Sequence, residues 1–321
     1  MIENNLTISL KRAIQDGRWI ESSEILINEV NNLGGKLTTD EFLKKKEHPS
    51  TTILKKTLED YESETTELIK LVLISSNYEI NKNSNDIYIR IIKKMLGFRK
   101  NNEDSYGYIW AHISNYPLLL VTYSIGIMSL YFKKYNLLFD LFNIEIEQRY
   151  LNDSFVDKFK SMLIEGINSY HLFNNIENIN VDVIQYFPKY NSNGNGSANA
   201  MRIEVNHRVY NYLEPLMESY FINKKEFSDY FDLYEFFLGL VFMDQRLVKD
   251  NLVFAPYGRH YWKYSGSGRY FNSNDSIVND FINETIERKN KVLEVGFFNN
   301  DLQRFNNSIK EYQNLLSRIY I

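Results

Sequence analysis

The sequence predicts an all-α fold built from antiparallel helical pairs, arranged as an irregular or solenoid-like array. Three observations carry this prediction. Apolar residues recur at helical spacing along most of the chain. Glycine and proline, which break helices, number only 14 and 5 among 321 residues. The strict alternation of apolar and polar residues that is typical of half-buried strands is almost absent.

Four helical segments are predicted in the first hundred residues. They cover residues 6–14, 19–33, about 50–73 and 87–98. The first two form a hairpin in this prediction, because Asp16 and Gly17 interrupt the apolar period between them. The pair Gly34 and Gly35 is predicted to end the second segment, since glycine is a poor helix former.

A polar break at residues 101–105 is the predicted boundary between an N-terminal helical region, 1–104, and a helical core region, 105–321. The two regions can pack as one unit. Pro117 suits the first turn of the next helix. Residues 118–132 are apolar on all sides of that helix, which predicts the centre of the core. The run is shorter than the roughly 20 residues of a membrane span.

The remaining predicted helices alternate with less regular stretches. The helices cover residues 137–146, 155–167, 203–221, 227–247, 277–295 and 302–319. Residues 181–184 are compatible with a short strand, and residues 191–197 predict a flexible loop. Residues 252–271 contain one proline and three glycines among many aromatic residues, which predicts an irregular aromatic turn in the C-terminal third.

Composition excludes several function classes. The 37 basic and 41 acidic residues give a net charge of −4, so a globally basic nucleic-acid binder is excluded, although a local basic patch is not. Without cysteine the chain has no disulfide, thiolate metal site or cysteine nucleophile. The five histidines show no His-x-x-x-His spacing, so we expect neither a metal nor a cofactor. The N-terminal residues lack a basic and apolar leader pattern, so we expect a cytoplasmic protein without membrane attachment.

Arg202 and His207 form an Arg-x-x-x-x-His motif at the start of a predicted helix. This motif resembles the catalytic signature of HEPN-type ribonucleases, which are metal-independent. In that family the histidine acts as general acid and base on the ribose 2′-hydroxyl, and the arginine steadies the phosphate. Here Ile203 follows the arginine, where the family often has a polar residue. The alternative interpretation is an exposed arginine and a hydrogen-bonded histidine.

The densest cluster of aromatic and cationic residues lies at 255–264 and contains Arg259, His260 and Trp262. Such a cluster can stack bases, clamp a phosphate or line a small-molecule pocket. It can equally pack an irregular loop onto helices. Trp110 and His112 are weaker candidates for binding on the same grounds.

Three stretches of the chain, residues 110–127, 231–244 and 255–262, share an order and spacing with a known pattern. They read Trp-Ala-His-Ile through Tyr-Pro-Leu-Leu-Leu-Val-Thr-Tyr-Ser-Ile-Gly-Ile, Phe-Asp-Leu-Tyr-Glu-Phe-Phe-Leu-Gly-Leu-Val-Phe-Met-Asp, and Ala-Pro-Tyr-Gly-Arg-His-Tyr-Trp. These runs resemble the helical C-terminal regions of multidomain bacterial proteins associated with defence. In those proteins the regions follow sirtuin-like, TIR-like or related nucleotide-handling domains.

The resemblance implies a sensing, scaffolding or oligomerising role, and it supplies no catalytic residue. The first hundred residues here predict helices and no dinucleotide-binding fingerprint. We expect either a separately encoded effector domain or a chain that works without one. We therefore expect a non-enzymatic helical sensor or scaffold in a bacterial defence system, anti-phage systems included. It would bind a protein partner or a trigger at residues 256–262, or self-associate. The alternative is a ribonuclease that uses Arg202 and His207, so enzymatic activity stays open.

Overall fold

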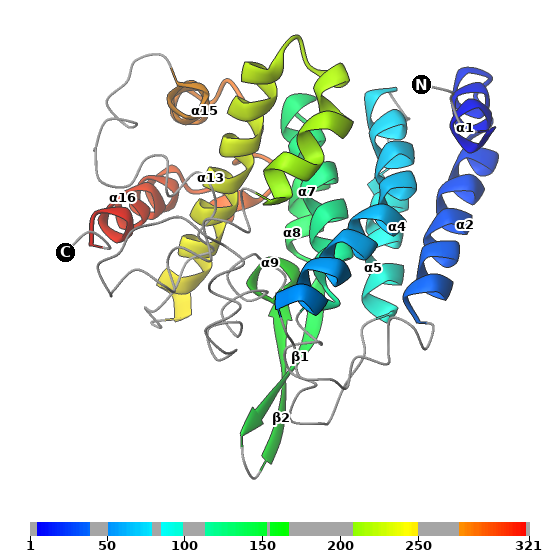
Figure 1. Cartoon of the computed structure of the whole chain (residues 1–321). Helices are drawn as coiled ribbons and strands as arrows, with labels where there is room; N and C mark the ends of the chain where they lie inside the picture. Colours follow the sequence, from blue (N-terminus) through cyan, green and yellow to red (C-terminus); the bar gives the residue numbers. More distant parts are fainter. Residues whose placement is uncertain are drawn as a thin grey trace. The chain divides into compact units, whose positions relative to one another are not determined.

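The fold is all-α, as predicted, with one added β-hairpin (Figure 1). The computed structural model describes residues 5–38, 51–78, 85–98, 113–152, 155–166, 208–249 and 276–318. Three predictions, the strand at 181–184, the loop at 191–197 and the irregular aromatic turn at 252–271, lie outside these residues. Among the described helices, none combines the length and the apolar character that crossing a membrane requires.

Two compact units make up the chain. The first comprises Met1–Met128 and His171–Tyr220, and the second comprises Ser129–Tyr170 and Phe221–Ile321. The division falls inside helix α7 (Tyr116–Tyr131) rather than near residue 104. Residues 99–112 lie outside the described part of the chain, so a boundary at 104 stays a prediction.

The first unit is assembled around α4 (Thr51–Asn77), which contacts both preceding helices. The other helices of this unit are α1 (Asn5–Gln15), α2 (Trp19–Leu37), α5 (Asn85–Gly97), an α-helix at 208–217 and the 3-10 turn η3 (Glu218–Tyr220). Each apolar face is buried at three- and four-residue spacing, as with Leu26, Val30 and Leu33 of α2. The predicted helices of the first hundred residues are therefore present.

The prediction that Gly34 and Gly35 end the second helix is wrong. Helix α2 continues through both glycines to Leu37, and the Thr38 hydroxyl closes it by donating to the Gly34 carbonyl at 2.8 Å. A contact with Phe98, directly after α5, explains why this helical position is a glycine. A Cβ atom on Gly34 would lie 2.0 Å from Cζ of Phe98, so the glycine makes room for that ring inside a helix.

The second unit is organised around α13 (Lys224–Lys249), which contacts α9, α15, η4 and α16. The other elements of this unit are α8 (Tyr135–Phe142), β1 (Glu145–Asn152), β2 (Phe155–Met162), α9 (Leu163–Gly166), α15 (Ile277–Ile286), η4 (Phe297–Asn300) and α16 (Leu302–Arg318). The core of this unit is aromatic. Phe237 packs at 5.3 Å from Phe281 and 4.8 Å from Phe297 between ring centroids.

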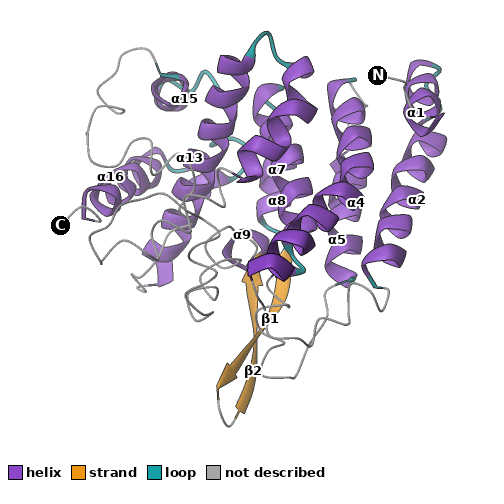
Figure 2. Ribbon diagram, in the orientation of Figure 1, coloured by secondary structure: helices purple, strands orange, loops and turns teal. Residues whose placement is uncertain are grey.

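The helix predicted over 137–146 is wrong at its end, because α8 ends at Phe142 and β1 begins at Glu145. The helix predicted over 155–167 is wrong except at α9, because residues 155–162 form strand β2. It pairs antiparallel with β1, with Asn152 opposite Phe155 (orange in Figure 2). Phe155 and Phe159 are four residues apart, a spacing that places two side chains on one face of a strand as well as of a helix. The decisive pattern is at the start of β1, where buried Ile144 and Ile146 flank exposed Glu145.

The prediction of a fully buried helix after Pro117 is confirmed. Helix α7 begins at Tyr116, with the proline in its first turn, and every residue from 115 to 130 is buried. A helix buried on all sides needs no polar face, which is why the run lacks charge. The prediction of one helix over 277–295 is wrong in its second half, because α15 ends at Ile286.

Candidate functional site

All seven site residues expected from the sequence lie outside the described part of the chain. They are Arg202, His207, Trp110, His112, Arg259, His260 and Trp262. Their roles therefore stay predictions. Three features of the described residues were not expected from the sequence: a buried ion-pair network, an aromatic surface patch and a pocket.

A largely buried ion pair between Glu62 of α4 and Arg208 is the centre of the network. The carboxylate accepts hydrogen bonds from Nε of Arg208 at 2.7 Å and from its Nη2 at 2.8 Å. The Tyr116 hydroxyl donates a third, at 2.7 Å. The side chains of Arg208 and Glu62 are only 18% and 14% exposed. A bidentate charge-assisted pair fixes the geometry of both side chains, and removing either partner would leave the other as a largely buried charge.

Two further hydroxyl groups complete the network. Tyr212 donates to the backbone carbonyl of Glu62 at 2.7 Å, and Thr66 donates to the same carbonyl at 2.7 Å. The two hydroxyls are 2.9 Å apart. The network thus joins α4, α7 and the helix at 208–217 within the first unit. The carboxylate oxygens of Glu62 are already satisfied by protein donors, so the network holds helices together.

The sequence offered little sign of this pair, because its two residues are 146 positions apart. The nearest hint is that Arg208 directly follows His207 of the Arg-x-x-x-x-His motif. The arginine of that motif is Arg202, whereas the arginine that pairs with a carboxylate in the described structure is Arg208.

Burial and the nearby Glu62 carboxylate raise the pKa of Tyr116 well above its ordinary value near 10. Burial also raises the pKa of Tyr212, to about 12. The folded state holds these phenolic protons more tightly than the unfolded state, whose tyrosines ionise near pH 10. The stability from the neutral hydroxyls is fully present below pH ~10 and is lost as the pH rises toward the folded pKa values.

We therefore expect the free energy of unfolding of the first unit to fall as pH rises above about 10. The Tyr116→Phe variant should lose stability at neutral pH, because Glu62 loses a donor, but should show a shallower decline between pH 9 and 11.5. Urea unfolding followed by circular dichroism at a series of pH values measures both effects. Tyr78→Phe, at the half-exposed end of α4, is the matched control. A Tyr116→Phe slope equal to that of the parent would contradict the assignment.

An aromatic patch lies on the second unit, where the end of α7 meets the start of α13. The Tyr131 ring lies 5.0 Å from Phe132, 4.6 Å from Phe221 and 5.0 Å from Tyr230 between centroids. Ile222, next to buried Phe221, is 83% exposed. We call Tyr131, Phe132, Ile222 and Tyr230 the Ile222 patch.

The exposed position of Ile222 is held by the cap of α13. Asn223 accepts a hydrogen bond from the Glu226 backbone N–H at 2.9 Å, and the Glu226 carboxylate accepts one from the Ile222 N–H at 2.6 Å. This is a variant of the capping box. The apolar contact before the helix is made by Phe221 on Phe227, 5.5 Å apart, which leaves Ile222 pointing outward. A rigid turn thus presents an apolar side chain to solvent.

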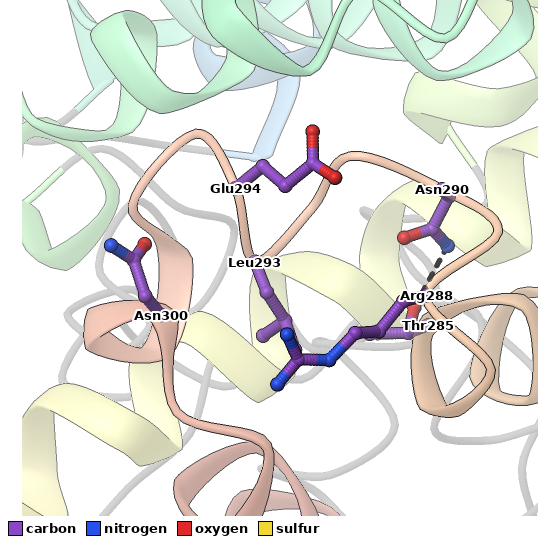
Figure 3. A pocket seen from close by; sticks show the side chains of 6 residues that line it. All are labelled: Thr285, Arg288, Asn290, Leu293, Glu294 and Asn300. Carbon is purple, nitrogen blue, oxygen red and sulfur yellow. Dashed lines mark hydrogen bonds between the residues drawn. The ribbon is translucent and has the colours of Figure 1, made fainter.

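A pocket of about 150 Å³ opens between the end of α15 and η4 in the second unit (Figure 3). It is lined by Thr285, Arg288, Asn290, Leu293, Glu294 and Asn300. The floor is buried and the rim is exposed. On the floor, Thr285 donates to the Phe281 carbonyl at 2.7 Å and accepts from Asn290 Nδ2 at 2.8 Å. The Asn290–Thr285 bond fixes the chain where it turns back after α15, which ends at Ile286 and does not reach residue 295.

Two residues that line the pocket, Arg288 and Asn300, have left-handed backbone, and so do residues just before Asn300. Arg288 has φ 54°, and Phe298, Asn299 and Asn300 follow one another with φ of 54°, 54° and 60°. Gly296 has φ 111°. Residues other than glycine pay an energetic cost in this region, and such positions gather at ligand-binding sites. The pocket is therefore our candidate for a small-molecule site.

Metal binding finds no support in the part of the chain that is described, where no group of three or more histidine, aspartate and glutamate side chains could hold an ion. Comparison of the chain with models of known protein families, with curated proteins and with solved structures gives no match.

Proposed function

We propose that this protein is a non-enzymatic helical scaffold or sensor module that binds a protein partner through the Ile222 patch. The observation that supports the proposal is an isoleucine that is 83% exposed and whose N–H is bonded by the cap of α13. Its neighbour in sequence, Phe221, packs on the rings of Tyr131 and Tyr230. Aromatic side chains are enriched at protein interfaces, and a rigid apolar anchor loses little conformational freedom on binding.

The biological setting comes from the resemblance to helical regions of bacterial defence proteins. In that setting the partner is a separately encoded effector, and the trigger is a product of infection or stress. Part of the resemblance lies on α13, whose first turns contribute Tyr230 to the patch. In this proposal the protein acts in the cytoplasm. The contact expected at residues 256–262 would be a second part of the surface that binds the partner.

Replacing Ile222 by aspartate is expected to weaken partner binding at least about tenfold, because it puts a charge at the centre of an apolar contact. The tagged protein would be recovered from its native host, and partner stoichiometry measured by mass spectrometry. Ile20→Asp is the matched control, because Ile20 is 78% exposed on α2 and lies outside the patch. A stoichiometric partner kept by the control and lost by Ile222→Asp supports the proposal. Equal retention by both variants contradicts it.

The second candidate function is a metal-independent ribonuclease that uses Arg202 and His207. One observation favours it: the chain directly after His207 is anchored, since Arg208 is held by Glu62 in the first unit. The same purified protein decides between the two functions. RNA cleavage by the parent that disappears in His207→Ala, with the melting temperature unchanged, would replace the scaffold proposal.

A further inference from the structure

We propose that the pocket at the end of α15 binds a small zwitterion, a free α-amino acid with a short side chain. The Arg288 guanidinium would bind its carboxylate and the Glu294 carboxylate would bind its ammonium group. This site is separate from the Ile222 patch, and the proposal does not depend on partner binding.

The floor of the pocket is preorganised. Besides the Thr285–Asn290 hydrogen bond, Asn290 Oδ1 accepts from the Val292 backbone N–H at 3.2 Å. These buried polar groups satisfy one another, so the floor holds its shape without a ligand. Buried Leu293 adds an apolar surface that suits a short aliphatic side chain.

The rim offers the groups that a ligand would use. Arg288, Glu294 and Asn300 are exposed, and within the described residues their side chains make no hydrogen bond or ion pair. In the view of Figure 3, Leu293 lies between the Glu294 carboxylate and the Arg288 guanidinium. One cationic and one anionic group therefore border the same pocket without pairing with each other. A guanidinium matches a carboxylate bidentately, and a carboxylate is the natural partner of an ammonium group.

The position of Arg288 points to a role for its side chain. It occupies the left-handed site of a Schellman motif, with its N–H bonded to the Thr285 carbonyl and the Lys289 N–H bonded to that of Glu284. Glycine is the usual residue at this site.

Two other helices end in the same way within the described residues. Gly17 takes the equivalent site after α1, whereas Lys133 takes it after α7 and pairs with Glu284 at 3.1 Å. Lys133 and Arg288 thus occupy equivalent sites, and both side chains are cationic. The partner of Lys133 is in the chain, and we infer that the partner of Arg288 is the ligand.

The size of the pocket limits the ligand. A cavity of this volume holds a molecule of about six non-hydrogen atoms, comparable to benzene. L-alanine has this number of non-hydrogen atoms and both charged groups, so it is the probe that suits the pocket.

Titration of the full chain with L-alanine, followed by nuclear magnetic resonance or calorimetry, tests the proposal. Acetate lacks the ammonium group, methylamine lacks the carboxylate, and inorganic phosphate tests for a general anion site. We expect L-alanine to bind at least about tenfold more tightly than any of the three, since two charged contacts replace one. No binding of L-alanine, or equal binding of acetate or phosphate, overturns the proposal.

Variants locate the site. Arg288→Gln and Glu294→Gln should each weaken L-alanine binding about tenfold or more. Lys289→Gln is the control, because Lys289 is adjacent to Arg288 but does not line the pocket. This variant should bind L-alanine as tightly as the parent does. Arg288→Gly should abolish binding yet melt at or above the temperature of the parent, because glycine suits the left-handed site. Unchanged binding in Arg288→Gln and Arg288→Gly assigns the ligand elsewhere and refutes the proposal.

Discussion

Replacing Glu62 by alanine is expected to lower the free energy of unfolding of the first unit by about 3 kcal/mol. The substitution removes a bidentate acceptor from Arg208 and the partner of the Tyr116 hydroxyl. Arg208 is then left as a largely buried charge without its carboxylate, and that desolvated charge accounts for most of the loss.

Glu64→Ala is the matched control for this experiment. Glu64 lies on the same helix two residues away, and it pairs with Lys36 where the lysine side chain is 57% exposed. Exposed pairs contribute less than about 1 kcal/mol, so Glu64→Ala should have a small effect. Urea unfolding followed by circular dichroism measures both variants. Similar losses in the two variants would mean that the Glu62 pair is no stronger than a surface ion pair.

A double substitution distinguishes the attraction between the two charges from the cost of removing them from water. With Glu62→Met and Arg208→Met combined, no buried charge remains, and apolar side chains fill the space. We expect the double variant to recover most of the stability that Glu62→Met alone loses. Additive losses would instead show that the two residues stabilise the protein independently.

The second large effect is expected for Gly239→Ala in the middle of α13. A Cβ atom at this position would lie 2.6 Å from Cζ of Tyr312 on α16, and Tyr312 is only 1% exposed. Because the ring is buried, either the ring or the two helices must shift to admit the methyl group. Overpacking of this kind costs roughly 1–3 kcal/mol, more than the gain of up to ~1 kcal/mol from the higher helix propensity of alanine.

The matched control is Gly35→Ala near the end of α2. No atom lies within 4 Å of the Cβ that this substitution adds. Only the propensity term remains, so Gly35→Ala should raise stability by about 0.5–1 kcal/mol. The same chemical change is thus expected to act with opposite sign at the two sites. Thermal unfolding measures both, and a stabilised Gly239→Ala would show that the helices are not in close contact.

A compensating change tests the cause of the Gly239→Ala loss. Tyr312→Leu shortens the side chain that meets the new methyl group, although it leaves a cavity of its own. The combined variant should be less destabilised than the sum of the two single variants. A purely additive result would place the cause of the loss in the glycine backbone and not in the contact with Tyr312.

Local patterns account for what could be predicted of the fold. The apolar face of α2 and the charge-free run of α7 are visible in the sequence, since each depends on residues within a few helical turns. The sequence-based prediction was wrong where a helix and a strand share the same local pattern. Phe155 and Phe159 fit a helix and a strand alike, and pairing with residues of β1 selects the strand.

The candidate sites were less predictable than the fold. Glu62 and Arg208 are 146 residues apart in the sequence, and neither belongs to a motif that predicts an ion pair. The pocket depends on the end of α15, which Asn290 and Thr285 determine by a hydrogen bond between side chains. The Ile222 patch depends on which of two adjacent apolar residues is buried, and the ring contacts of Phe221 decide that.

By itself, the sequence determined that the chain is helical, which helical faces are apolar and that α7 is buried on all sides. These properties follow from the spacing of apolar residues, and spacing is local. Only the tertiary structure decided that a helix passes through Gly34, that residues 155–162 form a strand, and that Ile222 and Arg288 remain exposed. Each of these outcomes depends on a neighbour brought close by folding, because burial and hydrogen bonding are properties of contacts and not of a single segment.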